Sequence, residues 1–301
     1  MSDVISVTSG VSQGSVLGPI LFIIYINDIC DLSERYQKLV TFKLFADDVK
    51  VYTSVNDFNS VDQLQTCLND VARWADDWQL KLSPNKCCVL QVGNNCLNSA
   101  YYVCGVCLPL VNNMRDLGVS MDKNLNFKLH INGMCVKAKQ RASLILRCFY
   151  TRNKNILFKA FTTYVRPLLE YCCSVWSPNQ CNLLDKIEGI QRNFTKKLFG
   201  LQHLSYKDRL VALNAESLEI RRIKADLLLY FKIFHKLIDL DENDFFVLNK
   251  SVTRGHQFKI KKKHAINNNV SNSFCNRSVN AWNNIPTHVV FSCSLPTFKT
   301  G

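Results

Sequence analysis

The sequence lacks any apolar run long enough to cross a membrane. The longest uninterrupted apolar stretch near its start, VLGPILFIIYI at residues 16–26, is about half of the roughly 20 residues that a membrane helix needs. The first residues also lack the pattern of a secretory signal peptide. We therefore expect an intracellular protein, nuclear or cytoplasmic, with no membrane association, and we expect residues 16–26 to form part of a hydrophobic core.

Common hydrolase and metal-binding signatures are also missing. None of the six histidines lies in an H-E-x-x-H motif. Cys104 and Cys107 have the spacing of half a zinc site, but no second pair lies at zinc-finger spacing, and Gly105 between them suits a hairpin turn. The 14 cysteines are scattered through 301 residues, which favours reduced thiols. The sequence thus favours neither a zinc protein nor a disulfide-stabilised one.

Acidic residues are scarce in the second part of the chain. Residues 1–132 contain 10 Lys and Arg against 13 Asp and Glu, a net charge of −3, whereas residues 133–301 contain 27 against 11, a net charge of +16. Clustered Lys and Arg neutralise phosphates and release counterions, so the second part is a candidate surface for a polyanion. The alternative is that these cations lie on ordinary solvated helix faces. Charge alone supports the two interpretations about equally.

Hydrophobic patterning predicts an α+β fold. An apolar helix is expected from Pro19 to Ile29, followed by two runs of alternating apolar residues around an acidic turn, which is the pattern of a β-hairpin. Ser60 and Gln63 form a capping box at the start of an amphipathic helix. Short strands follow as far as residue 122, and we expect one antiparallel sheet with helices on one side. Helical spacing dominates residues 133–245.

Two adjacent acids, Asp47 and Asp48, lie between the strands of the predicted hairpin, TFKLFADDVKVYTSV at residues 41–55. A metal-dependent phosphoryl transferase needs carboxylates held at the edge of a sheet, because Mg²⁺ prefers oxygen ligands. Aspartate is also common in turns for a local reason, since its side chain hydrogen-bonds its own backbone. Taken alone, the pair favours a turn over a site.

The neighbouring motifs change this balance. GVSQGSVLGPILFIIYIND at residues 10–28 is followed by FADD at residues 45–48. Together they resemble reverse transcriptases of jockey-like non-LTR retrotransposons, which carry a G-V-P-Q-G-S-x-L-G-P segment and then F/Y-A-D-D. Ser12 stands where that family usually has proline, a change that removes a backbone restraint but no functional group.

Further segments extend the resemblance in the same order along the chain. Motifs that co-occur in order are more specific than any single match. The segments are WADDWQLKLSPNK at residues 74–86, MRDLGVSMD at 114–122, YVRPLLEYCCSVWSP at 164–178 and NRSVNAWNNIP at 276–286.

The resemblance implies an RNA-directed DNA polymerase that extends a DNA primer on an RNA template, using deoxynucleoside triphosphates and Mg²⁺ or Mn²⁺. It implies that Asp47 binds the catalytic metal ions with Asp48 as a supporting ligand, and that Lys86 protonates the departing pyrophosphate. From the residues alone, Lys86 reads as a surface lysine and residues 117–119 as an ordinary strand. The remaining implied residues are Gln13, Gly14 and Ser15 for the nucleotide and template, and Leu117, Gly118 and Val119 for the primer end.

The implied domains are a partial palm in residues 1–132, a helical thumb-like domain in 133–245, and a basic segment with a small C-terminal module in 246–301. The family's palm has another metal-binding aspartate upstream of the glycine-rich segment, and we expect this chain to lack it together with the fingers. Two hypotheses follow. The chain is a polymerase fragment that is inactive or very weak alone, or it is a non-catalytic remnant that binds nucleic acid through phosphates.

Overall fold

The computed structural model describes residues 10–11, 14–36, 39–93, 97, 99–249, 255–264 and 268–300. Contacts between Cα atoms divide the chain into two compact units. Unit 1 contains Met1–Met114 and Asp122–Asn124, and unit 2 contains Arg115–Met121 and Leu125–Gly301. Among the helices of the described residues, none has the length and apolar character needed to cross a membrane.

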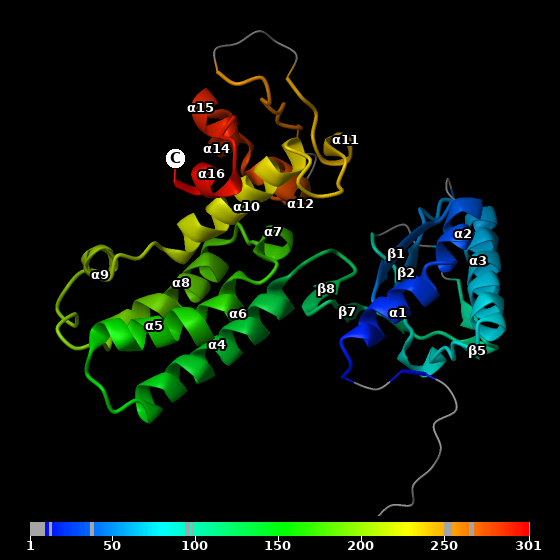
Figure 1. The fold of residues 1–301 in the computed structure, drawn as a ribbon, viewed down its shortest axis with the longest axis horizontal. Helices are drawn as coiled ribbons and strands as arrows, with labels where there is room; N and C mark the ends of the chain where they lie inside the picture. The colour runs from blue at the N-terminus through cyan, green and yellow to red at the C-terminus, as the bar shows by residue number, and fades with distance from the viewer. Residues whose placement is uncertain are drawn as a thin grey trace, which may run out of the picture. The chain divides into compact units, whose positions relative to one another are not determined.

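Unit 1 combines helices with short strands, so the predicted α+β class is confirmed (Figure 1). The boundary between the units passes through the last two strands, β7 and β8. The elements are α1 (Leu17–Ile26), α2 (Ile29–Arg35), β1 (Thr41–Phe45), β2 (Asp48–Tyr52), α3 (Phe58–Asp77), the 3₁₀ helix η1 (Pro84–Lys86), β3 (Val89–Leu90), β4 (Tyr102–Val103), β5 (Val106–Cys107), β6 (Leu110–Val111), β7 (Asn113–Asp116) and β8 (Val119–Asp122).

The apolar helix near the start of the chain is α1, and its surroundings differ from the prediction. It ends at Ile26, and a separate helix, α2, begins at Ile29. The sequence predicted a core element, but Ile26 is the only buried residue of α1, and Ile20 and Ile24 are exposed. A helix that is apolar on every side needs neighbours on every side to be buried. The described residues of unit 1 cover only part of its surface.

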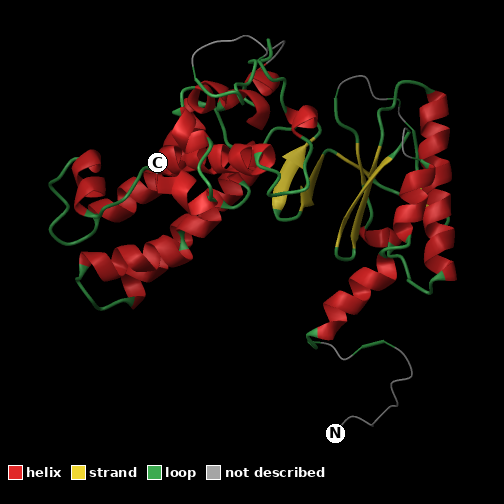
Figure 2. Cartoon of the chain, turned by 45° about the horizontal axis from the view of Figure 1, so that its top comes forward, coloured by secondary structure: helices red, strands yellow, loops and turns green. Residues whose placement is uncertain are grey.

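The described strands form four separate pairs rather than the single antiparallel sheet that was predicted (Figure 2). The pairs β1–β2 and β4–β5 are antiparallel, whereas β3 and β6 run parallel. Strands of two residues, such as β3 and β6, make too few ladder hydrogen bonds to build a wide sheet. The turn between β4 and β5 contains Cys104 and Gly105, which confirms the hairpin interpretation of this segment.

The amphipathic helix α3 forms as predicted, but it begins at Phe58, and Asp57 is its N-cap. The Asp57 carboxylate accepts hydrogen bonds from the Ser60 amide at 2.8 Å and from the Ser60 hydroxyl at 2.6 Å. The predicted capping box at Ser60 is therefore wrong, because a carboxylate three residues earlier already satisfies that amide. The apolar face is confirmed, since Val61 and Val71 are buried.

Unit 2 consists mainly of helices (Figure 1). An isolated antiparallel bridge joins Leu248 to Ile260. The helices are α4 (Lys128–Cys148), α5 (Lys154–Tyr164), α6 (Arg166–Glu170), α7 (Cys173–Trp176), α8 (Cys181–Lys196), α9 (Tyr206–Ala212), α10 (Leu218–Phe234), α11 (Glu242–Phe245), α12 (Asn268–Ser271), α13 (Phe274–Arg277), α14 (Val279–Asn283), α15 (Thr287–Val290) and α16 (Leu295–Thr300).

Two hydrophobic clusters stabilise unit 2, and helix α10 contributes to both. The first cluster is built on α4, α5, α6 and α8, with Phe161 and Ile187 fully buried, and it includes Leu218 at the start of α10. The second cluster packs the last turns of α10, including Tyr230, against Trp282 and the other short C-terminal helices. The proposed division of the chain at residues 132 and 245 stays a prediction.

Candidate functional site

The acidic pair lies at the tip of the β1–β2 hairpin. Phe45 pairs with Asp48 across the hairpin, so Ala46 and Asp47 form a two-residue turn and Asp48 is the first residue of β2. Phe42 on β1 is buried in the core of unit 1, but both aspartates are exposed. Core packing therefore holds the strands, while the two carboxylates remain accessible at the tip.

The hairpin turn contains an unusual backbone conformation. Ala46 has a φ of +51°, in the left-handed region that residues with a Cβ rarely adopt. Such outliers persist only when the surrounding structure imposes them, and they are enriched at functional sites. Here the register of β1 and β2 leaves exactly two residues for the turn, and the second of these is Asp47.

We expect Ala46→Gly to raise the free energy of unfolding by about 1 kcal/mol, because glycine adopts positive φ without the steric cost of a Cβ. Urea denaturation measures the change. The matched control is Ala72→Gly within α3, which should lower stability by about 1 kcal/mol because glycine is a poor helix former. Equal destabilisation by both substitutions would show that the turn does not strain Ala46.

The chemistry of the acidic pair fits a magnesium ion. Asp47 and Asp48 offer carboxylate oxygens, and proteins usually bind Mg²⁺ through one or two carboxylates, with waters and substrate phosphates completing the shell. Within the described ranges, no group of three or more His, Cys, Asp or Glu side chains is arranged to hold a metal ion. The assignment of Asp47 and Asp48 as metal ligands stays a prediction.

The other predicted residues of unit 1 lie on the glycine-rich loop and on η1. Gln13 lies outside the described residues. Gly14 has a φ of +81°, and the Ser15 hydroxyl accepts a hydrogen bond from the Gly18 amide at 3.1 Å, which stabilises the first turn of α1. Lys86 is exposed at the end of η1. Their roles toward a nucleotide stay predictions.

The predicted primer-binding residues form the turn between β7 and β8, in unit 2. Leu117 and Gly118 both have positive φ, +42° and +86°, and Val119 is buried at the start of β8. The Leu117 carbonyl accepts a hydrogen bond from the Tyr171 hydroxyl at 2.9 Å. The structure therefore places Asp47 in unit 1 and this turn in unit 2.

A basic helical surface in unit 2 is the largest feature that motif analysis missed. Residues 125–169 contain nine Lys and Arg and no Asp or Glu. They include the neighbouring helices α4 and α5, where Ala138 and Ile145 face the core and Lys137, Lys139 and Arg147 are exposed. The acid-free stretch is visible in the sequence, but the helical phase shows how its cations are placed: Lys139 and Arg147 lie on one side of α4, and Lys137 lies on the opposite flank of its exposed face.

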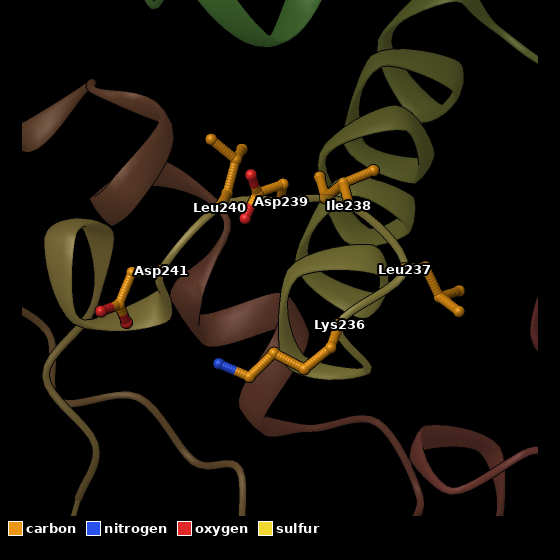
Figure 3. A pocket seen from close by; sticks show the side chains of 6 residues that line it. All are labelled: Lys236, Leu237, Ile238, Asp239, Leu240 and Asp241. Atoms are coloured by element: carbon orange, nitrogen blue, oxygen red, sulfur yellow. The ribbon is translucent and has the colours of Figure 1, made fainter. Parts of the chain in front are cut away.

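Two cavities lie in unit 2, and neither is lined by any of the predicted site residues. The first, of about 430 Å³, is formed by the loop 236–241 after α10, and Figure 3 shows its side chains spreading outward rather than converging. The second, of about 520 Å³, is mainly apolar and is lined by Trp176, Leu229 and Phe274, with Lys128 as the one ionisable residue among its lining side chains. Neither cavity has the convergent polar groups of a substrate site.

Comparison with known families finds a match in the first part of the chain. Residues 3–121 match the family described as reverse transcriptase (RNA-dependent DNA polymerase). This segment contains the glycine-rich loop, the Asp47–Asp48 hairpin, η1 and most of the β7–β8 pair. No solved structure matches the chain significantly.

Individual relatives show which kind of reverse transcriptase the chain is similar to. The chain is 26% identical over 207 residues to a probable RNA-directed DNA polymerase from transposon X-element of Drosophila melanogaster, and 29% identical over 210 residues to an RNA-directed DNA polymerase from mobile element jockey of Drosophila funebris. It is 33% identical over 125 residues to an uncharacterized protein of Caenorhabditis elegans. The chain is thus related to reverse transcriptases of non-LTR retrotransposons, which confirms the resemblance found in its motifs.

The matched regions are parts of longer proteins. The alignments cover 65% and 66% of this chain but only 22% and 23% of the X-element and jockey proteins. The alignment with the Caenorhabditis elegans protein covers 40% of this chain and 63% of that protein. The polymerase activities named for the X-element and jockey proteins belong to much longer proteins, of which the matched regions are less than a quarter.

Proposed function

We propose that this chain is part of an RNA-directed DNA polymerase of a non-LTR retrotransposon, in which unit 1 carries catalytic carboxylates and unit 2 binds the template and primer. The observation that carries the proposal is the accessible Asp47–Asp48 pair at the tip of the β1–β2 hairpin, within the segment that matches the reverse transcriptase family. Localisation in the nucleus or the cytoplasm is compatible with this function.

In this proposal Asp47 and Asp48 would hold Mg²⁺ or Mn²⁺. Bound in a two-metal site, the metal would stabilise the charge on the oxygens during nucleotidyl transfer. Gln13, Gly14 and Ser15 would contact the nucleotide and template, and Lys86 would donate a proton to the leaving pyrophosphate. We also propose weak or absent incorporation by the chain alone. Two-metal sites combine carboxylates from several segments, and among the described residues no third acidic, His or Cys side chain joins Asp47 and Asp48 in a metal-binding group.

The metal assignment is tested by titrating the protein with Mn²⁺ in the presence of a primer–template hybrid and a deoxynucleoside triphosphate, with free Mn²⁺ followed by electron paramagnetic resonance. We expect Asp47→Asn to weaken binding about tenfold or more, because a charged ligand is lost from the ion. The matched control is Asp62→Asn, on the exposed face of α3, which should bind Mn²⁺ as the unaltered protein does. Equal affinity in Asp47→Asn would contradict the assignment.

Catalysis is tested separately by primer extension with the same variants. Any incorporation by the unaltered chain should disappear in Asp47→Asn and persist in Asp62→Asn. Incorporation undiminished by Asp47→Asn would refute the proposed catalytic role, whatever the metal titration shows.

The basic surface of α4 and α5 supports the second hypothesis, a nucleic-acid-binding protein without catalysis. Nine cations without an acid in residues 125–169 would attract phosphates and release counterions from a duplex. Nucleic-acid binding is compatible with the polymerase function and would stand even if the metal assignment were refuted. It predicts binding whose affinity depends steeply on salt concentration.

We expect the double substitution Lys139→Gln/Arg147→Gln to weaken binding of an RNA–DNA hybrid and to reduce the slope of log Kd against log salt by about two, because both cations lie on one side of α4 and each phosphate contact contributes about one. Fluorescence anisotropy at several salt concentrations measures this slope. The control, Lys207→Gln/Lys299→Gln, removes the same charge from exposed sites elsewhere in unit 2. Equal slopes in the two variants would show that general charge, not this surface, governs binding.

A further inference from the structure

The turn between β7 and β8 is held by a residue far away in the sequence. The Tyr171 hydroxyl donates a hydrogen bond to the Leu117 carbonyl at 2.9 Å, across a separation of 54 residues. The Tyr171 ring also lies against Gly118, where an added Cβ would come within 3.3 Å of the ring atom Cε1. Because Gly118 has a φ of +86° as well, both the backbone conformation and the close approach of the ring favour glycine there.

Two hydrogen bonds hold the backbone of Tyr171 in place. Its carbonyl accepts a hydrogen bond from Nε1 of Trp176 at 2.7 Å, and its amide donates to the Pro167 carbonyl at 3.0 Å. Trp176 is almost fully buried, with 1% of its surface exposed. The next residue, Cys172, adopts a left-handed conformation with a φ of +50°, which turns the chain from α6 into α7. The Tyr171 backbone therefore has little freedom.

A second contact joins β8 to the same buried tryptophan. The Ser120 amide on β8 donates to Nδ1 of His130 at 3.3 Å, and the His130 ring lies 5.5 Å from the Trp176 ring, measured between centroids. Burial lowers the pKa of His130, and the charges of Arg115 and Lys137 lower it further. The ring is therefore neutral at pH 7, so Nδ1 is able to accept this hydrogen bond.

The Tyr171 hydrogen bond determines which way one peptide group faces. The chain contains no cis peptide bonds among the described residues. In a planar trans peptide the carbonyl and the amide point in opposite directions. Since the Leu117 carbonyl points to Tyr171, the N–H of Gly118 points away from Tyr171. An amide in this position is a hydrogen-bond donor for a phosphate or sugar oxygen.

We propose that Tyr171 is a positioning residue, which orients the Leu117–Gly118 peptide so that the Gly118 amide binds the 3′ end of the primer. The inference rests on the proposed function, which assigns this turn to the primer. It adds a residue from the α6–α7 connection that touches neither the nucleotide nor the metal. Loss of the tyrosine hydroxyl would let the peptide rotate, because no side chain then holds its carbonyl.

The test uses the full chain with Tyr171→Phe, which removes only the hydroxyl. Hydrogen–deuterium exchange of residues 113–122 in the free protein reports on the hairpin itself, and we expect exchange about fivefold to tenfold faster, the effect of losing one hydrogen bond. The matched control is Tyr164→Phe, which removes a hydroxyl from an exposed tyrosine on α5. Unchanged exchange in Tyr171→Phe would overturn the inference.

Photo-cross-linking then reports on the primer. A hybrid whose primer ends in 4-thiothymidine should cross-link to residues 113–122 of the unaltered protein. We expect Tyr171→Phe to lower this yield about fivefold, while the Kd for the hybrid stays unchanged because the basic helices still bind its phosphates. Gly118→Ala, which places a methyl group against the Tyr171 ring, should lower the yield with the hydroxyl intact.

The outcomes separate the two proposals. If the unaltered protein binds the hybrid but cross-links elsewhere, the assignment of the turn to the primer is wrong, and the positioning role falls with it. If the unaltered protein cross-links through residues 113–122 and Tyr171→Phe does so equally well, the proposed function stands and the role of Tyr171 is refuted.

Discussion

Replacing Arg277 by methionine is expected to lower the free energy of unfolding of unit 2 by about 3–5 kcal/mol, the cost of leaving one partner of a buried ion pair without the other. Nε and Nη2 of Arg277 each donate to the Asp226 carboxylate at 2.8 Å, and Nη2 also donates to the Ser174 carbonyl at 2.7 Å. The Asp226 side chain is only 3% exposed. Without Arg277, the Asp226 carboxylate stays buried with no positive charge beside it, and its burial keeps bulk water from solvating it.

Arg277 joins three parts of unit 2, which explains the size of the effect. Asp226 lies on α10, Ser174 on α7 and Arg277 itself on α13, so one guanidinium connects the C-terminal helices to the main bundle. Ser278 adds a hydrogen bond to the same carboxylate at 2.8 Å. Urea denaturation followed by tryptophan fluorescence reports the change, since Trp176 and Trp282 are both buried in this unit.

The control for Arg277→Met is the double variant Asp226→Asn/Arg277→Met. We expect it to be less destabilised than Arg277→Met alone, because a neutral amide does not need a buried cation. If the double variant loses as much stability as Arg277→Met, the effect comes from lost packing of the arginine side chain rather than from the unpaired carboxylate.

Replacing Arg222 by methionine is expected to have the opposite sign and to raise the free energy of unfolding by about 1–3 kcal/mol. Arg222 is 3% exposed on α10, and in the described part of the chain Nη1 and Nη2 have no hydrogen-bond partner. Burial lowers the pKa of its guanidinium, although the charge of Glu188 opposes this change. A methionine of similar length would fill the space without a buried charge.

Arg221, the preceding residue on α10, provides the matched control. Its guanidinium forms a bidentate ion pair with Glu170, so Arg221→Met should lower stability where Arg222→Met raises it. Both substitutions remove one positive charge from neighbouring positions of one helix. Destabilisation by Arg222→Met would indicate that a bound anion or water satisfies its guanidinium in solution.

The sequence was most informative where structure depends on neighbouring residues. Alternating apolar residues predicted the β1–β2 hairpin and placed Asp47 in its turn, because the pleat of a strand repeats every two residues. Helical spacing predicted α3 and its buried face. The cap of α3 was misplaced by one turn, since Asp57 and Ser60 are both favourable N-cap residues and the pattern alone does not rank them.

Contacts between distant segments were not predictable in the same way. The prediction of one antiparallel sheet failed because strand pairing depends on which short segments meet in space, and β3 paired in parallel with β6. The Tyr171 hydroxyl reaches Leu117 across 54 residues, and Arg277 reaches Asp226 across 51. No periodicity in the sequence marks such pairs, although each residue type is one that often forms hydrogen bonds.

The primary structure alone was enough for the resemblance to reverse transcriptases, the mixed class of the fold and the position of the acidic turn, because short motifs and local periodicity carry that information. Folding in three dimensions decided that α1 is largely exposed, that Lys139 and Arg147 lie on one side of α4, and that Tyr171 holds the turn at Leu117. These features depend on packing between elements separated by tens of residues, which local physical chemistry does not specify.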